Sequence, residues 1–168
     1  MVIHIDSSTK GAYPLSERQT RELLRFCSSV GASTFAANFL YVKGEESEQL
    51  ADEFYCRLAP FSAGRKRLEK VYGNGFAERD CWSLTEAAID LIVKETRGNL
   101  LAYDLLKLPE EWLVYIGDTI LLQVVNHEQE LTLRLTATQF RSFSQLGIPY
   151  VPGQAEYSGL PENPARTL

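Results

Sequence analysis

The sequence lacks the features that would distinguish it from an ordinary globular protein. It holds only three cysteines, two histidines and one methionine among 168 residues. No apolar run approaches the roughly 18 residues that a membrane-spanning helix requires, and the N-terminus lacks the basic segment that opens a signal peptide. Because the cysteines are odd in number and widely spaced, a disulfide framework is not expected. They are Cys27, Cys56 and Cys81. We therefore expect a cytoplasmic protein whose thiols are reduced.

Basic residues are also fewer than acidic ones. The chain has 17 Lys and Arg against 22 Asp and Glu, which gives a formal net charge of −5. This balance favours solubility and does not favour a general nucleic-acid binder. The hydrophobic share of 45% and the charged share of 23% are close to those of an average soluble protein, and the length fits one domain.

The N-terminal part of the chain shows strand and helix patterns in alternation. Residues 2–6 alternate and are rich in β-branched side chains, which predicts a strand. Ser16 with Gln19 forms a capping box and predicts a helix that ends at Gly31. A second strand is expected over residues 32–42.

A second helix is expected after the polar run 43–48, because apolar residues follow at four-residue steps until Pro60 ends the pattern. Residues 60–82 are the least informative part of the chain. Within them, 67–72 suit a strand, and the Gly-Asn-Gly at 73–75 predicts a turn. The apolar positions of the second helix are Leu50, Phe54 and Leu58.

The clearest helix pattern covers residues 84–96. Ser83 and Glu86 form a capping box before it, and Gly98 suits the residue that closes it. Residues 99–107 suit a helix and a strand equally. The apolar stripe of the helix is formed by Ala87, Ala88, Leu91 and Ile92.

From Pro109 onward the pattern becomes antiparallel. Pro109 and the two glutamates after it predict one helical turn, and three strands follow over 112–116, 119–125 and 130–136. The first two are joined by Gly117-Asp118, a hairpin turn with glycine in first place. Because the middle strand is apolar on both faces, we expect it to be covered on both sides.

The C-terminal end adds a short helix and a tail. Thr136 and Gln139 form a third capping box, which predicts a helix that runs to Gly147. Residues 148–168 hold four prolines and few aliphatic side chains, so we expect an extended Pro-rich tail after a single domain over 1–147. The fold class predicted is α+β: one mostly antiparallel sheet with a C-terminal three-stranded meander, packed by about four helices.

One pattern suggests a ligand at the N-terminal end. Val2-Ile3-His4-Ile5-Asp6-Ser7-Ser8 resembles the opening of flavodoxin-like, flavin-dependent azoreductases, whose serine-bearing first loop holds the flavin phosphate. The resemblance implies a phosphate-bearing ligand at Ser7-Ser8, where loop hydroxyls and backbone N–H groups donate toward an anion. It covers only these residues, and the antiparallel meander departs from the parallel sheet of that family.

Cys81 is the one candidate nucleophile. It lies just before the helix expected at Ser83, where the helix dipole lowers the pKa of a thiol, but it would need His4 or His127 nearby. A buried structural cysteine is the simpler interpretation.

His4 and Asp6 share a strand face, but two ligands are too few for a metal site. We expect no metal, no cofactor and no catalytic residue. The alternative is a small enzyme that uses Cys81 as a thiol nucleophile or binds a phosphate-bearing ligand at the Ser7-Ser8 loop.

The sequence also contains one basic cluster and two acidic runs. The basic cluster of Arg65, Lys66, Arg67 and Lys70 precedes aromatic residues, an arrangement that single-stranded nucleic acid prefers; a solvated strand or loop is the simpler interpretation. The acidic runs 45–48 and 110–111 suit the first turns of helices, and they would equally steer a basic protein partner.

These acidic runs lead to the functional hypothesis. We expect a non-enzymatic protein-interaction module, such as an acidic immunity or inhibitor protein or a small subunit of a larger assembly. A homo-oligomer stays open, and neither a membrane nor a nucleic acid is the expected partner. The predicted partner-binding residues are Glu45, Glu46, Glu48, Glu110 and Glu111.

Overall fold

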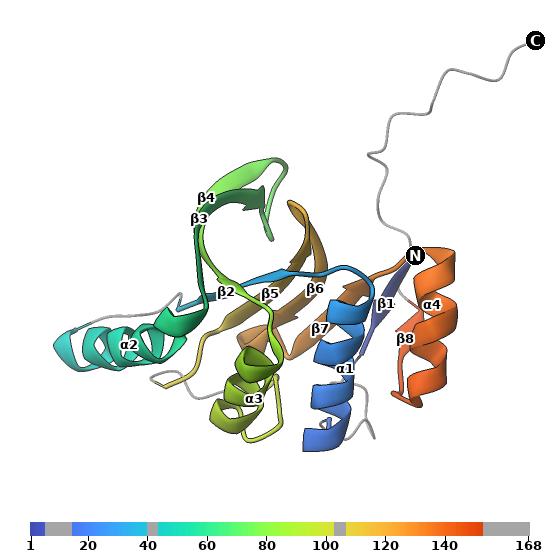
Figure 1. The fold of residues 1–168 in the computed structure, drawn as a ribbon, viewed down its shortest axis with the longest axis horizontal. Coiled ribbons are helices and arrows are strands. Elements are labelled where there is room, and N and C mark those ends of the chain that lie inside the picture. Colours follow the sequence, from blue (N-terminus) through green and yellow to red (C-terminus); the bar gives the residue numbers. More distant parts are fainter. Residues whose placement is uncertain (6–14, 40–43, 103–106, 153–168) are drawn as a thin grey trace, which may run out of the picture.

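The computed structural model describes residues 1–5, 15–39, 44–102 and 107–152, which form one sheet with helices packed on it (Figure 1). Its elements, in chain order, are β1 (Val2–His4), α1 (Glu17–Ser29), β2 (Thr34–Asn38), α2 (Glu45–Leu58), β3 (Ser62–Glu69), β4 (Phe76–Ser83), α3 (Glu86–Glu95), β5 (Glu111–Ile116), β6 (Thr119–Val125), β7 (Glu130–Arg134), α4 (Ala137–Phe143) and β8 (Val151–Pro152). Short 3-10 turns follow α2, β6 and α4, at Ala59–Phe61, Asn126–Glu128 and Ser144–Leu146.

The sheet has eight strands in the order β3-β4-β2-β5-β6-β7-β1-β8. Every pair of neighbouring strands is antiparallel, so the predicted α+β class is confirmed. β5, β6 and β7 are the predicted C-terminal meander, and Gly117 takes a φ of +61° in the turn between its first two strands. The described strands include no parallel pair, so the parallel sheet of the azoreductases is absent from this part of the chain.

The main core lies on one face of the sheet, beneath α1, α3 and α4 (Figure 1). Leu23 and Cys27 of α1 are fully buried there, as the spacing of the predicted helix requires. Phe143 of α4 packs its ring against the edge of Phe26 at 5.6 Å between centroids. The sheet contributes alternate side chains to this core, among them Phe35, Val114, Leu122, Leu131 and Leu133.

The opposite face of the sheet carries a second, smaller core under the β3–β4 hairpin, which curves back over the sheet (Figure 1). Glu69, the last residue of β3, ties this hairpin to β6. Its N–H donates to the carbonyl of Asp118 at 2.9 Å, and its carboxylate accepts from the N–H of Ile120 at 2.8 Å. β6 is therefore covered on both sides, as predicted. The buried residues of this core are Ala36, Leu68, Cys81, Leu113, Tyr115 and Ile120.

Two of the three predicted capping boxes are confirmed. Ser16 with Gln19 starts α1, and Thr136 with Gln139 starts α4, each with both reciprocal hydrogen bonds. The third is wrong, because Ser83 ends β4 and the cap of α3 is Thr85. The hydroxyl of Thr85 accepts from the N–H of Ala88 at 3.2 Å.

The later start of α3 also changes its buried face. The buried residues are Ala88, Ile89, Ile92 and Val93, whereas Ala87 is exposed and Leu91 is half-buried. The stripe predicted from Ala87 and Leu91 is therefore rotated from the observed one. Its three β-branched residues, Ile89, Ile92 and Val93, all lie on the core side, at the three- and four-residue spacing of a helix face.

Two further expectations are corrected between residues 60 and 111. The strand expected over 67–72 is instead the end of a longer one, since residues 62–69 and 76–83 form a hairpin around the predicted turn at 73–75 in which Arg65 and Arg67 stand opposite Asp80 and Glu78. The helical turn expected at Pro109 is absent, and Glu111 instead begins β5. Of residues 99–107, which suited helix and strand equally, the described ones belong to neither.

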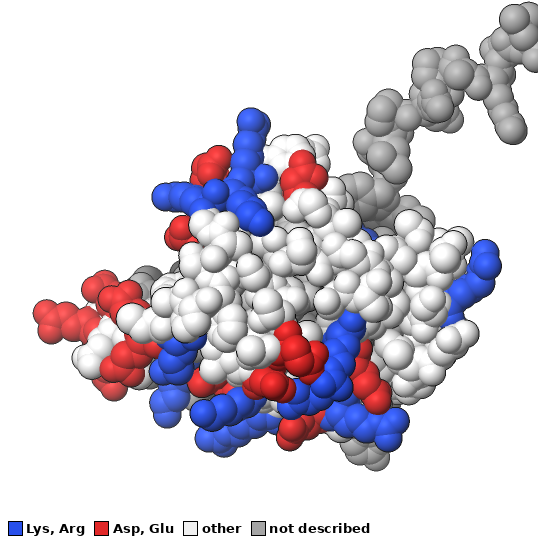
Figure 2. Space-filling model, in the orientation of Figure 1, with Lys and Arg blue, Asp and Glu red and all other residues white. Residues whose placement is uncertain are grey.

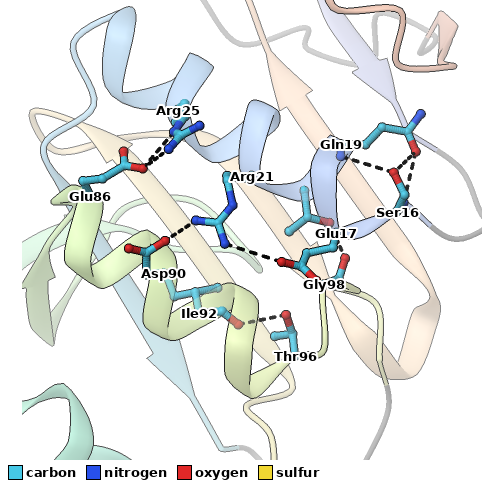
Figure 3. A network of polar contacts seen from close by, with 11 residues as sticks. Ser16, Glu17, Gln19, Arg21, Arg25, Glu86, Asp90, Ile92, Thr96 and Gly98 are labelled. Atoms are coloured by element: carbon cyan, nitrogen blue, oxygen red, sulfur yellow. Dashed lines mark hydrogen bonds and ion pairs between the residues drawn. The ribbon is translucent and has the colours of Figure 1, made fainter.

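α1 and α3 are joined by a network of ion pairs on their exposed sides (Figure 3). Arg25 pairs with Glu86, and Arg21 pairs with Asp90 and lies 3.5 Å from Glu17. Exposed pairs of this kind contribute little each, so the close approach below them matters more. Gly98, at the end of α3, has a φ of +76°, and a Cβ there would lie 2.5 Å from the Cα of Glu17.

We expect Gly98→Ala to destabilise the protein by ~2–4 kcal/mol, since a left-handed conformation and a backbone clash act together. Gly147→Ala is the matched control. Its φ is +66°, but a Cβ there has nothing within 4 Å, so the cost is about 1 kcal/mol. Urea unfolding followed by circular dichroism measures both values. Equal losses for the two variants would contradict the proposed close packing of α1 and α3.

Candidate functional site

The acidic residues at the start of α2 are exposed, as predicted, and they continue along the helix. Glu45, Glu46 and Glu48 occupy the first turn, and Asp52 and Glu53 follow on the same outward side. With Arg57, the helix carries five acidic residues and one basic residue, a net charge of −4 against −5 for the whole chain. Figure 2 shows these carboxylates gathered at the end of the molecule where α2 projects.

The helix dipole accounts for only part of this acidity. Negative side chains stabilise the first turn of a helix, and the effect fades beyond it. Asp52 and Glu53 lie about two turns further along, where the dipole contributes little. They line a shallow hollow on the outer side of α2 together with Glu45 and Glu48. The structure therefore presents a continuous acidic surface, which we call the α2 acidic face: Glu45, Glu46, Glu48, Asp52 and Glu53.

Glu110 and Glu111 do not belong to this surface. Each is only 2% exposed, and they stand at the start of a strand rather than of a helix. The carboxylate of Glu111 accepts from the side-chain amide of Asn38 at 3.0 Å and lies 3.8 Å from the guanidinium of Arg79. The expectation that these two residues form an exposed acidic patch is therefore wrong.

The buried and the exposed glutamates are expected to contribute differently to the stability of the protein. We expect Glu111→Gln to destabilise the protein by about 2–3 kcal/mol, because it leaves the largely buried charge of Arg79 without its partner. Glu46→Gln on the α2 acidic face is the control and is expected to change stability by about 0.5 kcal/mol or less. Urea unfolding of the two variants measures the difference, and a neutral Glu111→Gln would contradict a structural role for that carboxylate.

Cys81 lies in β4 and faces the second core. It is 1% exposed, and its thiol donates to the carbonyl of Arg79 at 3.3 Å. Burial raises the pKa of this thiol, and the nearby charge of Lys66 opposes the rise only in part. His4 lies in β1, five positions along the sheet from β4, and contacts Glu130 at 3.4 Å. The structure does not bring a thiol and an imidazole together at these two residues.

The three thiols differ in exposure, which makes the enzyme alternative testable. Cys56 is exposed on α2, whereas Cys27 and Cys81 are buried, and burial raises the pKa of Cys27 to about 12. We expect iodoacetamide at neutral pH to modify Cys56 alone in the folded protein, since the thiolate is the reactive form.

Mass spectrometry after brief labelling measures the modified sites. Cys56→Ser is the control and should abolish labelling of the folded protein, while urea should expose the other two thiols. Labelling of Cys81 faster than Cys56 would instead support the thiol nucleophile.

The basic cluster lies on the β3–β4 hairpin. The register places Asp80 opposite Arg65 and Glu78 opposite Arg67, and Figure 2 shows both signs of charge mixed over the hairpin. Lys66 donates to the hydroxyl of Thr34 at 3.0 Å. With acidic residues opposite two of its cations, the hairpin lacks the one-signed surface that nucleic acid attracts.

The other candidate ligand sites are the pair His4 and Asp6 and the Ser7-Ser8 loop. Ser7, Ser8 and Asp6 lie outside the described residues. Elsewhere, no three His, Cys, Asp or Glu side chains of the described residues are grouped as a metal ion would need. Among the described helices, none combines the length and apolar character of a membrane span.

Comparison with protein-family models, with curated protein sequences and with solved structures finds no match to this chain. Its function must therefore be argued from its own residues. Sequence reasoning found the first turn of the acidic face but missed Asp52 and Glu53. Their signal was present in the spacing, since Glu45, Glu48 and Asp52 recur at steps of three and four on the side opposite Phe54.

Proposed function

We propose that this protein acts in the cytoplasm by binding another protein that carries a basic surface, and that the α2 acidic face is the binding surface. One observation carries the proposal: a single projecting helix holds nearly all of the net negative charge. The location is supported by the three cysteines, which all lie in the described part of the chain and are all free thiols.

A concentrated charge on a projecting element suits a binding role. Charged surfaces steer oppositely charged partners and raise association rates, and the effect falls as salt screens it. Within the α2 acidic face, only Glu53 accepts a side-chain hydrogen bond from a described residue, from Gln49 at 3.0 Å. The remaining carboxylates are therefore free to meet a partner. A second copy of this chain is the alternative partner.

The enzyme alternative has weaker support. Its nucleophile would be Cys81, whose burial and raised pKa disfavour the reactive thiolate. The acidic face, in contrast, is exposed along its length. A non-enzymatic binding module, such as an acidic inhibitor or a small subunit of a larger assembly, therefore remains the better proposal.

The test removes three charges from the first turn of α2 by substitutions that keep the shape of each side chain. The protein is isolated gently from its own cells and examined by native mass spectrometry, which identifies a stoichiometric protein partner or a homo-oligomer. The triple variant Glu45→Gln, Glu46→Gln and Glu48→Gln is then compared with wild type. We expect the triple variant to lose at least ~10-fold in affinity, mostly through slower association at low salt. Wild-type binding should weaken as the Debye length shrinks from about 10 Å to about 3 Å between 0.1 and 1 M salt.

A matched control removes three charges elsewhere. Glu78→Gln, Asp118→Asn and Glu128→Gln change exposed acidic residues outside α2 by the same total charge. Retained binding in this control and lost binding in the α2 variant support the proposal. Equal binding by both variants would place the interface elsewhere, and a lone monomer with a retained small molecule would overturn the binding function.

A further inference from the structure

A cavity of about 410 Å³ opens beside α2, where the sheet divides. It lies between β2, β4 and the end of α2, and Ser62 and Gly64 complete its wall. Its lining residues include Ala37, Asn38, Tyr55, Asp80, Cys81 and Trp82. None of the proposals above uses this cavity.

The cavity exists because β2 and β4 separate. β2 pairs with β5 over its whole length, from Thr34 to Asn38, but it pairs with β4 only through Thr34 and Phe35. A register shift between Ser62 and Gly64 of β3 lies at the same place, and bulges of this kind bend a strand. Beyond Phe35 the two strands therefore leave a space that side chains do not fill.

Aromatic side chains form one wall of the cavity. The rings of Tyr55 and Trp82 are stacked at 5.6 Å between centroids, with only 6° between their planes. The hydroxyl of Tyr55 donates to the carbonyl of Ala37 at 3.2 Å, and Phe39 and Phe35 pack against the two rings. These contacts hold the aromatic wall in one arrangement.

The charge at this wall is negative. Asp80 lines the cavity, and among the described residues its carboxylate makes no hydrogen bond or ion pair. Arg65 stands opposite it in the register without reaching it. Burial raises the pKa of Tyr55, and the carboxylates of Asp80 and Asp52 raise it further. The neighbouring cations Lys66 and Arg79 have other partners, since Lys66 donates to Thr34 and Arg79 pairs with Glu111.

We propose that this cavity binds a lysine or arginine side chain of the basic partner. The carboxylate attracts the charged end of a lysine or arginine side chain, and the aromatic wall packs against its apolar stem. The proposal rests on the proposed function and adds an anchor to it. Asp52 belongs to the α2 acidic face, and Tyr55 stands one turn further along the same helix. The cavity therefore adjoins the acidic face along the helix, within the surface that a basic segment on α2 would cover.

The probe is the blocked tripeptide acetyl-Gly-Arg-Gly-amide, added to isotope-labelled wild-type protein. The chain has two tryptophans, and the indole signal of Trp82, which lines the cavity, is followed by nuclear magnetic resonance. Trp112 lies outside the lining and serves as the internal reference. We expect a saturable shift of the Trp82 signal with a Kd on the order of millimolar. The citrulline tripeptide, which has nearly the same shape without the charge, should bind ~10-fold more weakly.

Two variants separate the anchor from general charge. Asp80→Asn should weaken binding of the arginine peptide ~5–10-fold, whereas Glu78→Gln, an exposed acid two residues away on the same strand, should not. Equal effects of the two variants, equal binding of the citrulline peptide, or no shift of Trp82 would each overturn the proposal. The α2 triple variant should bind the tripeptide as wild type does, so failure of the anchor and failure of the acidic face give different results.

Discussion

The carboxylate of Glu69 holds the β3–β4 hairpin in its curved position over the sheet. β3 and β6 are four positions apart in the strand order, so in a flat sheet they would be separated by roughly 19 Å. Glu69 of β3 nevertheless accepts from the N–H of Ile120 at 2.8 Å and from the guanidinium of Arg134 in β7 at 2.6 Å. Hydrogen bonds that involve a charged group contribute about 2 kcal/mol each. The hairpin can meet these partners only if the sheet curls.

This curl has two consequences that a flat sheet would not have. On its inner side, the hairpin covers Leu113 and Tyr115, which would otherwise stand exposed on the second face. At its hinge, β4 leaves β2 after Phe35, and the cavity beside Tyr55 and Trp82 opens there. The second core and the candidate anchor site therefore have one physical cause. The polar contacts of a single glutamate near the end of the hairpin support both of them.

Local patterns predicted the elements whose signals lie within one helix or one turn. The capping boxes at Ser16 and Thr136 and the turn at Gly117 were predicted correctly because each is decided by a few neighbouring residues. The hairpin over 62–83 was not, since its strands are stabilised by pairing and by a distant contact at Glu69. The cavity could not be predicted at all. It depends on where β2 and β4 part, which is a property of the whole sheet.

The five glutamates that the sequence predicts to bind a partner show what separates a structural carboxylate from an exposed one. Glu111 precedes five residues that are all apolar, and such a strand is covered on both faces. The carboxylate of Glu111, at the end of this strand, is therefore buried and needs a positively charged partner, which is Arg79. The acidic residues of α2 instead recur in phase with the helix, opposite Phe54 and Leu58, which are buried. When charged residues lie on the side of a helix opposite its apolar stripe, burial of that stripe keeps the charged side chains in solvent. The helix can thus carry its charge outward without requiring a partner inside the protein.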